Sequence, residues 1–392
     1  MKVDHVLRKS LLRPTRVSVT LSMFAASAIL NDGLSLSQEI KWQYESGVTA
    51  IPAASSTEPR VASFGKASVL SAVKYLDDGA AAWAESHSCI ACHTTGSYMA
   101  ERPALSPWLG NPPSIVRDNF VTETPNSLAP PPNPSARQQY EDQSGGLVWR
   151  SLGLAEWDRH VIGKLSEVTE RSPRDMLTQS RHDTGFWPTY HEMEIPYITT
   201  EFELSVHGAQ AIATAPNWLD QLKDEDMMQR IKTLKASLKS HLPRNNYERA
   251  MQLQLASFWP ELVSVEDRKK ASEMLWNLQN SDGGWSTRRM SNPDRWRDEV
   301  IADVQKLLAT NPEESDPYMT AFAVILLRGE NVPASDPRIQ KAIAWLKREQ
   351  RVSGRWWMRT MFRETYSYIT YIATAKSLTA LAACGELDFL KN

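Results

Sequence analysis

The fold of this chain is decided by the stretch LWNLQNSDGGW, which runs from Leu275 to Trp285. It begins as the end of an apolar helix, continues through a polar turn and closes on two glycines and a tryptophan. A glycine lets the backbone leave a helix in a left-handed or tight-turn conformation. The Gln279 amide can bond exposed backbone at the helix end, and Trp285 can fill the gap between neighbouring helices. The stretch therefore predicts a helix that stops in a fixed turn against another helix.

The same pattern recurs along the chain. One further copy is WLKREQRVSGRW at 345–356, and another is QSRHDTGFW at 179–187. A degenerate fourth copy has Gly79 and Trp83 after Tyr75. Each copy predicts a two-helix unit that cannot bury its apolar face alone, so the units must stack. Helices rich in small residues follow three of the tryptophans and begin near Tyr197, Tyr318 and Tyr371.

The helical period dominates the rest of the sequence. Apolar residues recur at i, i+3, i+4 and i+7 within 69–76, 202–213, 231–238 and 339–346, as on one face of a helix. Alternation typical of strands is scarce. We therefore expect an all-α chain, and the helical body from Ser63 onward has room for roughly six helix pairs at about 50 residues each.

The repeat resembles the QW motif of the terpenoid cyclase and prenyltransferase toroids, the squalene–hopene cyclase-like repeat proteins. The resemblance is strongest over 270–392, clear around 175–215 and weak before residue 100, and LQNSDGGWS is its most specific part. It implies a single-domain α/α toroid of about six helix pairs, with inner and outer helices around a central cavity. In the cyclases and prenyltransferases that cavity holds an apolar polyprenyl chain.

The resemblance does not extend to the catalytic residues of those families. Class II cyclases protonate their substrate with a DxDD cluster, and this sequence has none: Asp77 and Asp78 form only a dipeptide, and Asp303 stands alone. The protein prenyltransferases use a zinc site of Asp, Cys and His, whereas here Cys384 has no histidine after His241 to accompany it. The fold carries over without either chemistry, so the sequence leaves open whether the protein is an enzyme.

A second motif, HSCIACH at 87–93, is typical of covalent haem attachment. In such a site Cys89 and Cys92 form thioethers with the two vinyl groups, and His93 is the proximal iron ligand. The sequence therefore predicts one covalent haem c.

Other interpretations of the cysteine motif stay open. Cys89 and Cys92 can form a plain disulfide or a redox dithiol, or can bind zinc with His87 or His93, although no second knuckle supplies a fourth ligand. The sixth iron position is either open or filled by a residue distant in sequence. The candidates for that distal ligand are His182, His191, Met193, Met319 and Met361.

The N-terminus resembles an export signal. Basic residues precede an apolar stretch at 17–30 that is too short to span a bilayer, and small residues follow it. We expect a signal peptide over 1–37, a periplasmic or secreted protein, and a poorly ordered lead-in over 38–62. No transmembrane segment is expected after the signal peptide.

Two segments interrupt the expected helices. Nine prolines between 101 and 137 favour an extended loop, either a cover over the CxxCH site or a solvated linker. Residues 290–316 form an inserted segment that starts and ends in proline-containing loops and has a helical middle, RWRDEVIADVQKLLA. The toroid proper is therefore expected over 63–392.

Three functions are compatible with the sequence. The first is an exported haem protein with an electron-transfer or redox role, in which the toroid binds a redox partner or an apolar small molecule. The second is an enzyme acting on an isoprenoid or other apolar substrate in the cavity. The third is a scaffold with a Cys89–Cys92 disulfide. The net charge of −2 and the pI near 6.5 give no sign of nucleic-acid binding.

Overall fold

The computed structural model describes residues 42–87, 90–122, 136–189, 197, 200–291, 314–359 and 368–391. These residues belong to one compact unit. Helices dominate it, and the sheet found in the described residues is a single two-stranded hairpin. The all-α prediction is confirmed.

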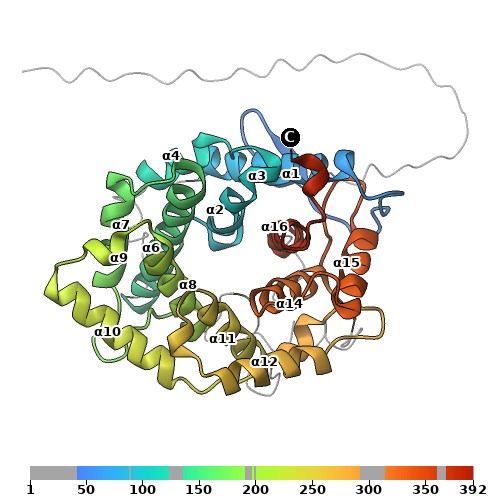
Figure 1. The fold of residues 1–392 in the computed structure, drawn as a ribbon. Helices are drawn as coiled ribbons and strands as arrows, with labels where there is room; N and C mark the ends of the chain where they lie inside the picture. Colours follow the sequence, from blue (N-terminus) through green and yellow to red (C-terminus); the bar gives the residue numbers. More distant parts are fainter. Residues whose placement is uncertain are drawn as a thin grey trace, which may run out of the picture. The chain divides into compact units, whose positions relative to one another are not determined.

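The helices form two concentric rings (Figure 1). The outer ring consists of α1 (Lys66–Ser86), α4 (Ser114–Thr122), α7 (Glu167–Thr178), α10 (Glu225–Ser240), α12 (Val265–Asn277) and α15 (Pro337–Glu349). The inner ring consists of α2 (Ser97–Glu101), α6 (Ala136–Trp157), α8 (Glu201–Thr214), α11 (Asn246–Phe258), α14 (Pro317–Gly329) and α16 (Tyr368–Ala383).

The inner ring closes on itself. Each inner helix contacts the next, in the order α2, α6, α8, α11, α14 and α16, and α16 contacts α2 again. Outer helices pack on this ring, for example α7 on α6 and α8, α12 on α11, and α15 on α14. The described helices thus form six outer–inner pairs, which confirms the predicted α/α toroid.

Three tryptophans hold the repeat turns in the same way. The indole Nε1 atoms of Trp187, Trp285 and Trp356 donate to carbonyl oxygens ten or eleven residues earlier, at 2.8, 2.6 and 2.7 Å. All three side chains are fully buried. Each tryptophan therefore satisfies a carbonyl near the end of an outer helix while it fills the space between helices, as the sequence predicts.

The glutamines of the turns connect neighbouring outer helices. Gln279 Nε2 donates to the carbonyl of Gly283 in its own turn (2.9 Å) and to that of Arg338 at the start of α15 (3.0 Å). Gln350 makes the same pair of bonds, with its own turn (3.0 Å) and with Ser68 of α1 (3.0 Å). Gln350 therefore connects the last outer helix to the first, where the ring closes.

Substituting Gln350 with leucine is expected to lower the free energy of unfolding by about 1–3 kcal/mol, because two buried carbonyls lose their donor. The Gln350 side chain is fully buried. Chemical denaturation monitored by circular dichroism measures the change. Gln340→Leu, at an exposed position of α15, is the matched control and should change stability little. Equal effects at both positions would contradict this role of Gln350.

The fourth repeat copy is a wrong prediction. Gly79 and Trp83 both lie inside α1, so no turn forms there. A Cβ atom at Gly79 would come within 2.8 Å of the Tyr371 ring. The glycine therefore permits close packing of α1 on α16. From the sequence alone, a glycine needed for such packing looks the same as a glycine that ends a helix.

The segment expected to be a poorly ordered lead-in is structured from residue 42 onward. Strands β1 (Trp42–Glu45) and β2 (Ala50–Pro52) form an antiparallel hairpin that contacts α1. Tyr44 is buried, with its ring 5.4 Å from that of Tyr371. The hairpin is ordered because this aromatic side chain completes the core between α1 and α16, so the prediction over 38–62 does not hold for these residues.

The proline-rich segment also differs from the predicted extended loop. Its described part contains short helices, which are η2 (Pro103–Leu105), α3 (Ser106–Leu109) and α4. Proline is compatible with the first turn of a helix, where its missing N–H has no partner in any case, and Pro103 and Pro107 occupy such positions. In this part of the chain, proline therefore marks where helices begin. The rest of the proline-rich segment, at 123–135, lies outside the described residues.

Several other predictions fall outside the described residues. They are the signal peptide over 1–37 and the central part of the inserted segment, at 292–313. The two ends of that insertion meet, since the amide of Asp316 donates to the carbonyl of Trp285 (2.8 Å). No described helix combines the length and the apolar composition that a bilayer-spanning segment needs.

The remaining short elements connect the rings. They are η1 (Cys92–Gly96), η3 (Asp158–Ile162), α9 (Trp218–Gln221), η4 (Pro260–Leu262), η5 (Thr287–Met290) and η7 (Asp388–Leu390).

Candidate ligand cavity at the centre of the toroid

A cavity of about 230 Å³ lies within the inner ring, and every inner helix contributes to its lining. One part of the lining is apolar: half of its six apolar side chains come from α14, with one each from α6, α11 and α16. The apolar side chains are Leu152, Leu253, Phe322, Ile325, Leu326 and Ile372. The space can therefore hold an apolar molecule.

Another part of the lining carries a relay of amides between α6, α8 and α11. Gln210 Nε2 donates to Glu156 Oε1 (3.1 Å), and Gln254 Nε2 donates to Gln210 Oε1 (2.9 Å). A carboxylate only accepts hydrogen bonds, so Glu156 fixes the direction of the whole relay. The relay ends in Gln254 Oε1, a buried acceptor without a partner among the described residues.

An ion pair lies between α2 and α16. Lys376 Nζ contacts Glu101 Oε1 at 2.5 Å, and Thr379 Oγ1 donates to Glu101 Oε2 at 2.8 Å. Lys376 also lies 5.3 Å from the centre of the Phe322 ring, within range of a cation–π interaction. Both charged side chains are nearly buried, and each is compensated by the other.

His207 and Trp149 meet at the polar side of the cavity, with their ring centres 4.8 Å apart. Burial lowers the pKa of His207 to about 3, and the charge of Lys376 acts in the same direction. The imidazole is therefore neutral at physiological pH. His207 Nδ1 and Trp149 Nε1 are buried and have no hydrogen-bond partner in the described part of the chain.

The stability of the protein should fall between pH 6.5 and pH 3 because of His207. In the unfolded chain this side chain takes up a proton below its ordinary pKa of 6.5, whereas in the folded state it stays neutral down to about pH 3. The stabilisation is thus complete above pH 6.5 and is lost as the pH falls, by about 2 kcal/mol at pH 5.

Denaturant titrations of the wild type and of His207→Gln at pH 7 and pH 5 measure this contribution. We expect the wild type to lose about 2 kcal/mol more than the variant on acidification. An equal loss in both proteins would show that His207 is protonated in the folded state.

A buried chain of hydroxyls lies between the N-terminal halves of α8, α11 and α14. Tyr247 Oη donates to Glu203 Oε1 (2.7 Å), and its oxygen lies 2.6 Å from Tyr318 Oη. Burial, reinforced by the charge of Glu203, raises the pKa of Tyr247 well above its ordinary value, so the hydroxyl stays protonated. The ring of Tyr197, a cavity residue, packs edge-on against Tyr318 at 5.6 Å.

The predicted haem-attachment motif occupies a different place. Cys89 lies outside the described residues, while Cys92 and His93 begin η1, a π-helical turn packed between α1, α2, α6 and α16. Both side chains are half-buried. His93 Nδ1 lies 2.9 Å from Thr94 Oγ1, which lies 3.0 Å from Tyr44 Oη. This chain of contacts fixes the orientation of the imidazole.

Two aromatic contacts further restrict His93. Its ring lies edge-on to Trp83 at 5.0 Å, and His87 stacks on the same indole at 3.8 Å. Burial lowers the pKa of His93 to about 4, with a smaller contribution from His87. Neither Cys92 nor His93 lines the central cavity. Among the described residues, no group of three His, Cys, Asp or Glu side chains is placed to hold a metal.

Two of the five candidate distal ligands, His182 and Met319, belong to the described residues. His182 is exposed after α7, with Nε2 3.3 Å from a guanidinium nitrogen of Arg230. Met319 is fully buried in α14. The remaining candidates, His191, Met193 and Met361, lie outside the described residues.

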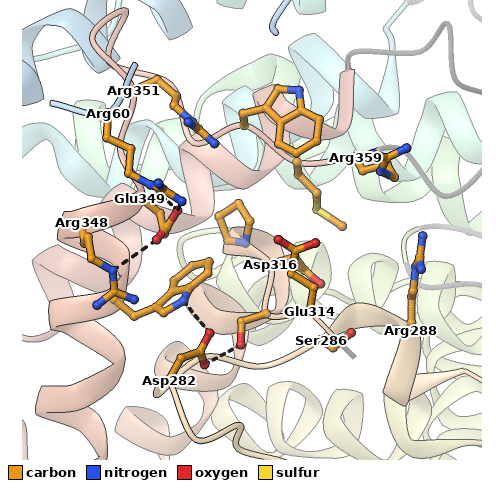
Figure 2. A pocket seen from close by; sticks show the side chains of 15 residues that line it. Arg60, Asp282, Ser286, Arg288, Glu314, Asp316, Arg348, Glu349, Arg351 and Arg359 are labelled. Carbon is orange, nitrogen blue, oxygen red and sulfur yellow. Dashed lines mark hydrogen bonds and ion pairs between the residues drawn. The ribbon is translucent and has the colours of Figure 1, made fainter. Parts of the chain in front are cut away.

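A second pocket, of about 470 Å³, lies where the ring closes (Figure 2). Three of its charged side chains form ion pairs. Glu349 binds Arg60 (2.6 Å) and Arg348 (3.3 Å), which connects the N-terminal segment to α15. Asp316 caps α14 through the Met319 amide (2.8 Å), and burial raises its pKa to about 6 despite its hydrogen bonds. These contacts are explained by ring closure and helix capping.

The cavity residues were not singled out from the sequence, although a signal exists. His207 and Gln210 interrupt an otherwise apolar and small-residue helix, as Lys376 does in α16. Isolated polar side chains in such helices point either to a buried network or to a lumen. The lumen itself becomes visible only when six helices are assembled.

The closed double ring, the Gln–Gly–Trp turns and the central cavity define a terpenoid cyclase-like α/α toroid. Residues 255–390 match the family model of the squalene-hopene cyclase C-terminal domain. The match covers the last four helices of the double ring, α12, α14, α15 and α16, together with the end of α11, where the sequence repeats are clearest.

Two curated relatives are similar to part of this chain. The terpene cyclase-glycosyl transferase fusion protein fsoA of Humicola fuscoatra is 29% identical over 149 residues, which are 35% of this chain and 10% of that protein. The enfumafungin synthase efuA of Hormonema carpetanum is 30% identical over 124 residues, 30% of this chain and 9% of that protein. The matched regions thus span about a tenth of the length of these relatives.

A solved structure, ent-copalyl diphosphate synthase from Streptomyces platensis, is also similar. It superimposes with a TM-score of 0.46 at 14% sequence identity, over 74% of this chain and 50% of that one.

Proposed function

We propose that this protein binds an apolar, isoprenoid-type molecule in the central cavity of the toroid and acts on it as an enzyme. The observation that carries the proposal is a lumen built by all six inner helices, whose lining combines apolar side chains, most of them on α14, with a few polar groups. Ligand sites of enzymes commonly combine such apolar walls with a few placed polar groups. The similarity to terpene cyclases supports the same substrate class.

The size of the cavity favours a small substrate. Its volume of about 230 Å³ lies between the ~150 Å³ cavity that accommodates benzene and the ~300 Å³ at which drug-sized sites begin. A molecule of about two isoprene units is therefore a better match than a long polyprenyl chain.

The lining supplies orientation and electrostatic stabilisation. The Phe322 ring and the Trp149 indole present aromatic groups to the cavity, and aromatic faces stabilise cationic species by cation–π interactions. Glu101 and Glu156 are both held by hydrogen bonds from neighbours, so they position groups in the cavity.

Extraction of the purified protein with organic solvent, followed by mass spectrometry, tests the proposal. We expect an isoprenoid in near-stoichiometric amount, or its uptake when the protein is incubated with small isoprenoids. A protein that releases none and takes up none would contradict the proposed function.

The second candidate function is covalent haem attachment, with Cys89 and Cys92 as anchors and His93 as proximal ligand. The Tyr44–Thr94–His93 chain supports it, since ligating histidines are commonly oriented by a hydrogen bond to the second ring nitrogen. The bound haem would supply one-electron redox chemistry to a partner protein. This candidate also depends on export to a periplasmic or extracellular space, which the N-terminal sequence favours.

Haem staining after denaturing electrophoresis tests this candidate. The protein is expressed in a host with haem-c maturation, beside Cys92→Ser. We expect the wild type to retain colour and the variant to lose it. A colourless wild-type band would exclude covalent haem.

A further inference from the structure

The polar atoms left without partners in the central cavity describe the ligand that would satisfy them. Trp149 Nε1, His207 Nδ1 and Gln254 Oε1 have no hydrogen-bond partner in the described part of the chain, and all three side chains line the cavity. Trp149 is 2% exposed and His207 is 6% exposed. Buried polar groups in folded proteins are normally paired, so unpaired ones on side chains that line a cavity point to a polar group in its ligand.

The chemistry of two of these atoms is fixed. The Trp149 indole nitrogen can only donate. Gln254 Oε1 can only accept. The Glu156 carboxylate accepts from Gln210 Nε2, so Gln210 Oε1 accepts from Gln254 Nε2, and the remaining amide atom of Gln254 is its oxygen. A single group that satisfies both atoms must accept one hydrogen bond and donate another, which is what a hydroxyl does. A carbonyl would leave Gln254 Oε1 without a donor.

The charge of the lining favours a neutral ligand. The lining carries two carboxylates, Glu101 and Glu156, and two cations, Lys376 and Arg159, while His207 is neutral. Lys376 is already paired with Glu101. A phosphate or carboxylate would therefore enter a cavity whose lining has no excess of positive charge, and it would lie near two carboxylates.

We infer that the ligand is an isoprenoid alcohol, whose hydroxyl oxygen accepts a hydrogen bond from Trp149 Nε1 and whose hydroxyl hydrogen is donated to Gln254 Oε1. The hydrocarbon part lies against the apolar side chains of the lining, half of which belong to α14. This inference rests on the proposed function and narrows it, since the proposed function requires only an apolar isoprenoid and the inference requires a hydroxyl on it.

Isothermal titration calorimetry with three probes of one carbon skeleton tests the inference. The probes are geraniol, the hydrocarbon that lacks only its hydroxyl, and geranyl diphosphate. We expect geraniol to bind at least about tenfold more tightly than the hydrocarbon, because the hydrocarbon leaves both polar atoms unpaired. The diphosphate should bind more weakly than geraniol.

Two variants test whether Trp149 and Gln254 cause the difference in affinity between geraniol and the hydrocarbon. Trp149→Phe and Gln254→Leu should each bring the affinities for geraniol and for the hydrocarbon close together. Gln229→Leu, at an exposed position of α10, is the matched control and should preserve the tenfold ratio. Circular dichroism confirms that each variant is folded.

The outcomes separate the inference from the proposed function. Equal affinity for geraniol and the hydrocarbon in the wild type would overturn the inference that the ligand carries a hydroxyl. The proposed binding of an isoprenoid in the cavity would be unaffected. Tightest binding of the diphosphate would overturn it in favour of an anionic ligand. Absence of binding by all three probes would overturn both.

Discussion

Substituting Gly354 with alanine is expected to lower the free energy of unfolding by more than about 4 kcal/mol, enough to prevent folding of a marginally stable chain. Gly354 has φ of +88°, a conformation that side-chain-bearing residues rarely adopt. A Cβ atom there would lie 2.3 Å from the amide nitrogen of Ala72, in the backbone of α1. The clash falls where the last outer helix meets the first, so relief requires opening the ring. Soluble yield and denaturant unfolding measure the effect.

Gly146→Ala is the matched control for this substitution. Gly146 lies within α6, and an added Cβ meets no atom within 4 Å. There the same substitution should stabilise the protein by about 0.5–1 kcal/mol, because alanine restricts the unfolded chain and favours helix. If Gly354→Ala were as stable as Gly146→Ala, the closed ring described above would be wrong at that contact.

Substituting Ala100 with phenylalanine is expected to abolish binding of small isoprenoids. Ala100 lies on α2 and contributes to the lining of the central cavity. The larger ring would occupy much of a space of about 230 Å³. Uptake of geraniol, measured by calorimetry, should become undetectable, at a cost in stability of about 1–3 kcal/mol from overpacking.

Ala236→Phe is the control for the blocked cavity. Ala236 is an exposed residue on the outer helix α10 and does not line the cavity, so the same change adds an aromatic ring outside the ligand site. This variant should bind the probe as the wild type does. Wild-type binding by a folded Ala100→Phe variant would show that the ligand binds elsewhere.

The toroid could be predicted from the sequence because its turns are local. Gln279, Gly283 and Trp285 lie within seven residues, and their hydrogen bonds are made largely within one turn, so the pattern survives in a single sequence. The hairpin at 42–52 could not be predicted in the same way. It is ordered by Tyr44 packing against Tyr371, a contact between distant parts of the chain.

The candidate site was less predictable than the fold. Trp149, His207 and Gln254 come from three helices and have no common sequence motif. Their significance follows from hydrogen bonds that are missing, which only a packed structure reveals. The CxxCH motif, in contrast, is conspicuous because its residues are adjacent in sequence, and its haem chemistry stays a prediction.

Photocrosslinking tests most directly whether the centre of the toroid is the ligand site. A small isoprenoid carrying a photoreactive diazirine is added to the protein and irradiated, and the labelled residues are identified by mass spectrometry. The structure predicts labels on the lumen side chains of α14 and α16, with Phe322, Ile325 and Ile372 foremost, and competition by unlabelled geraniol. Labels confined to the outer helices, or unaffected by the competitor, would contradict a ligand site in the central cavity.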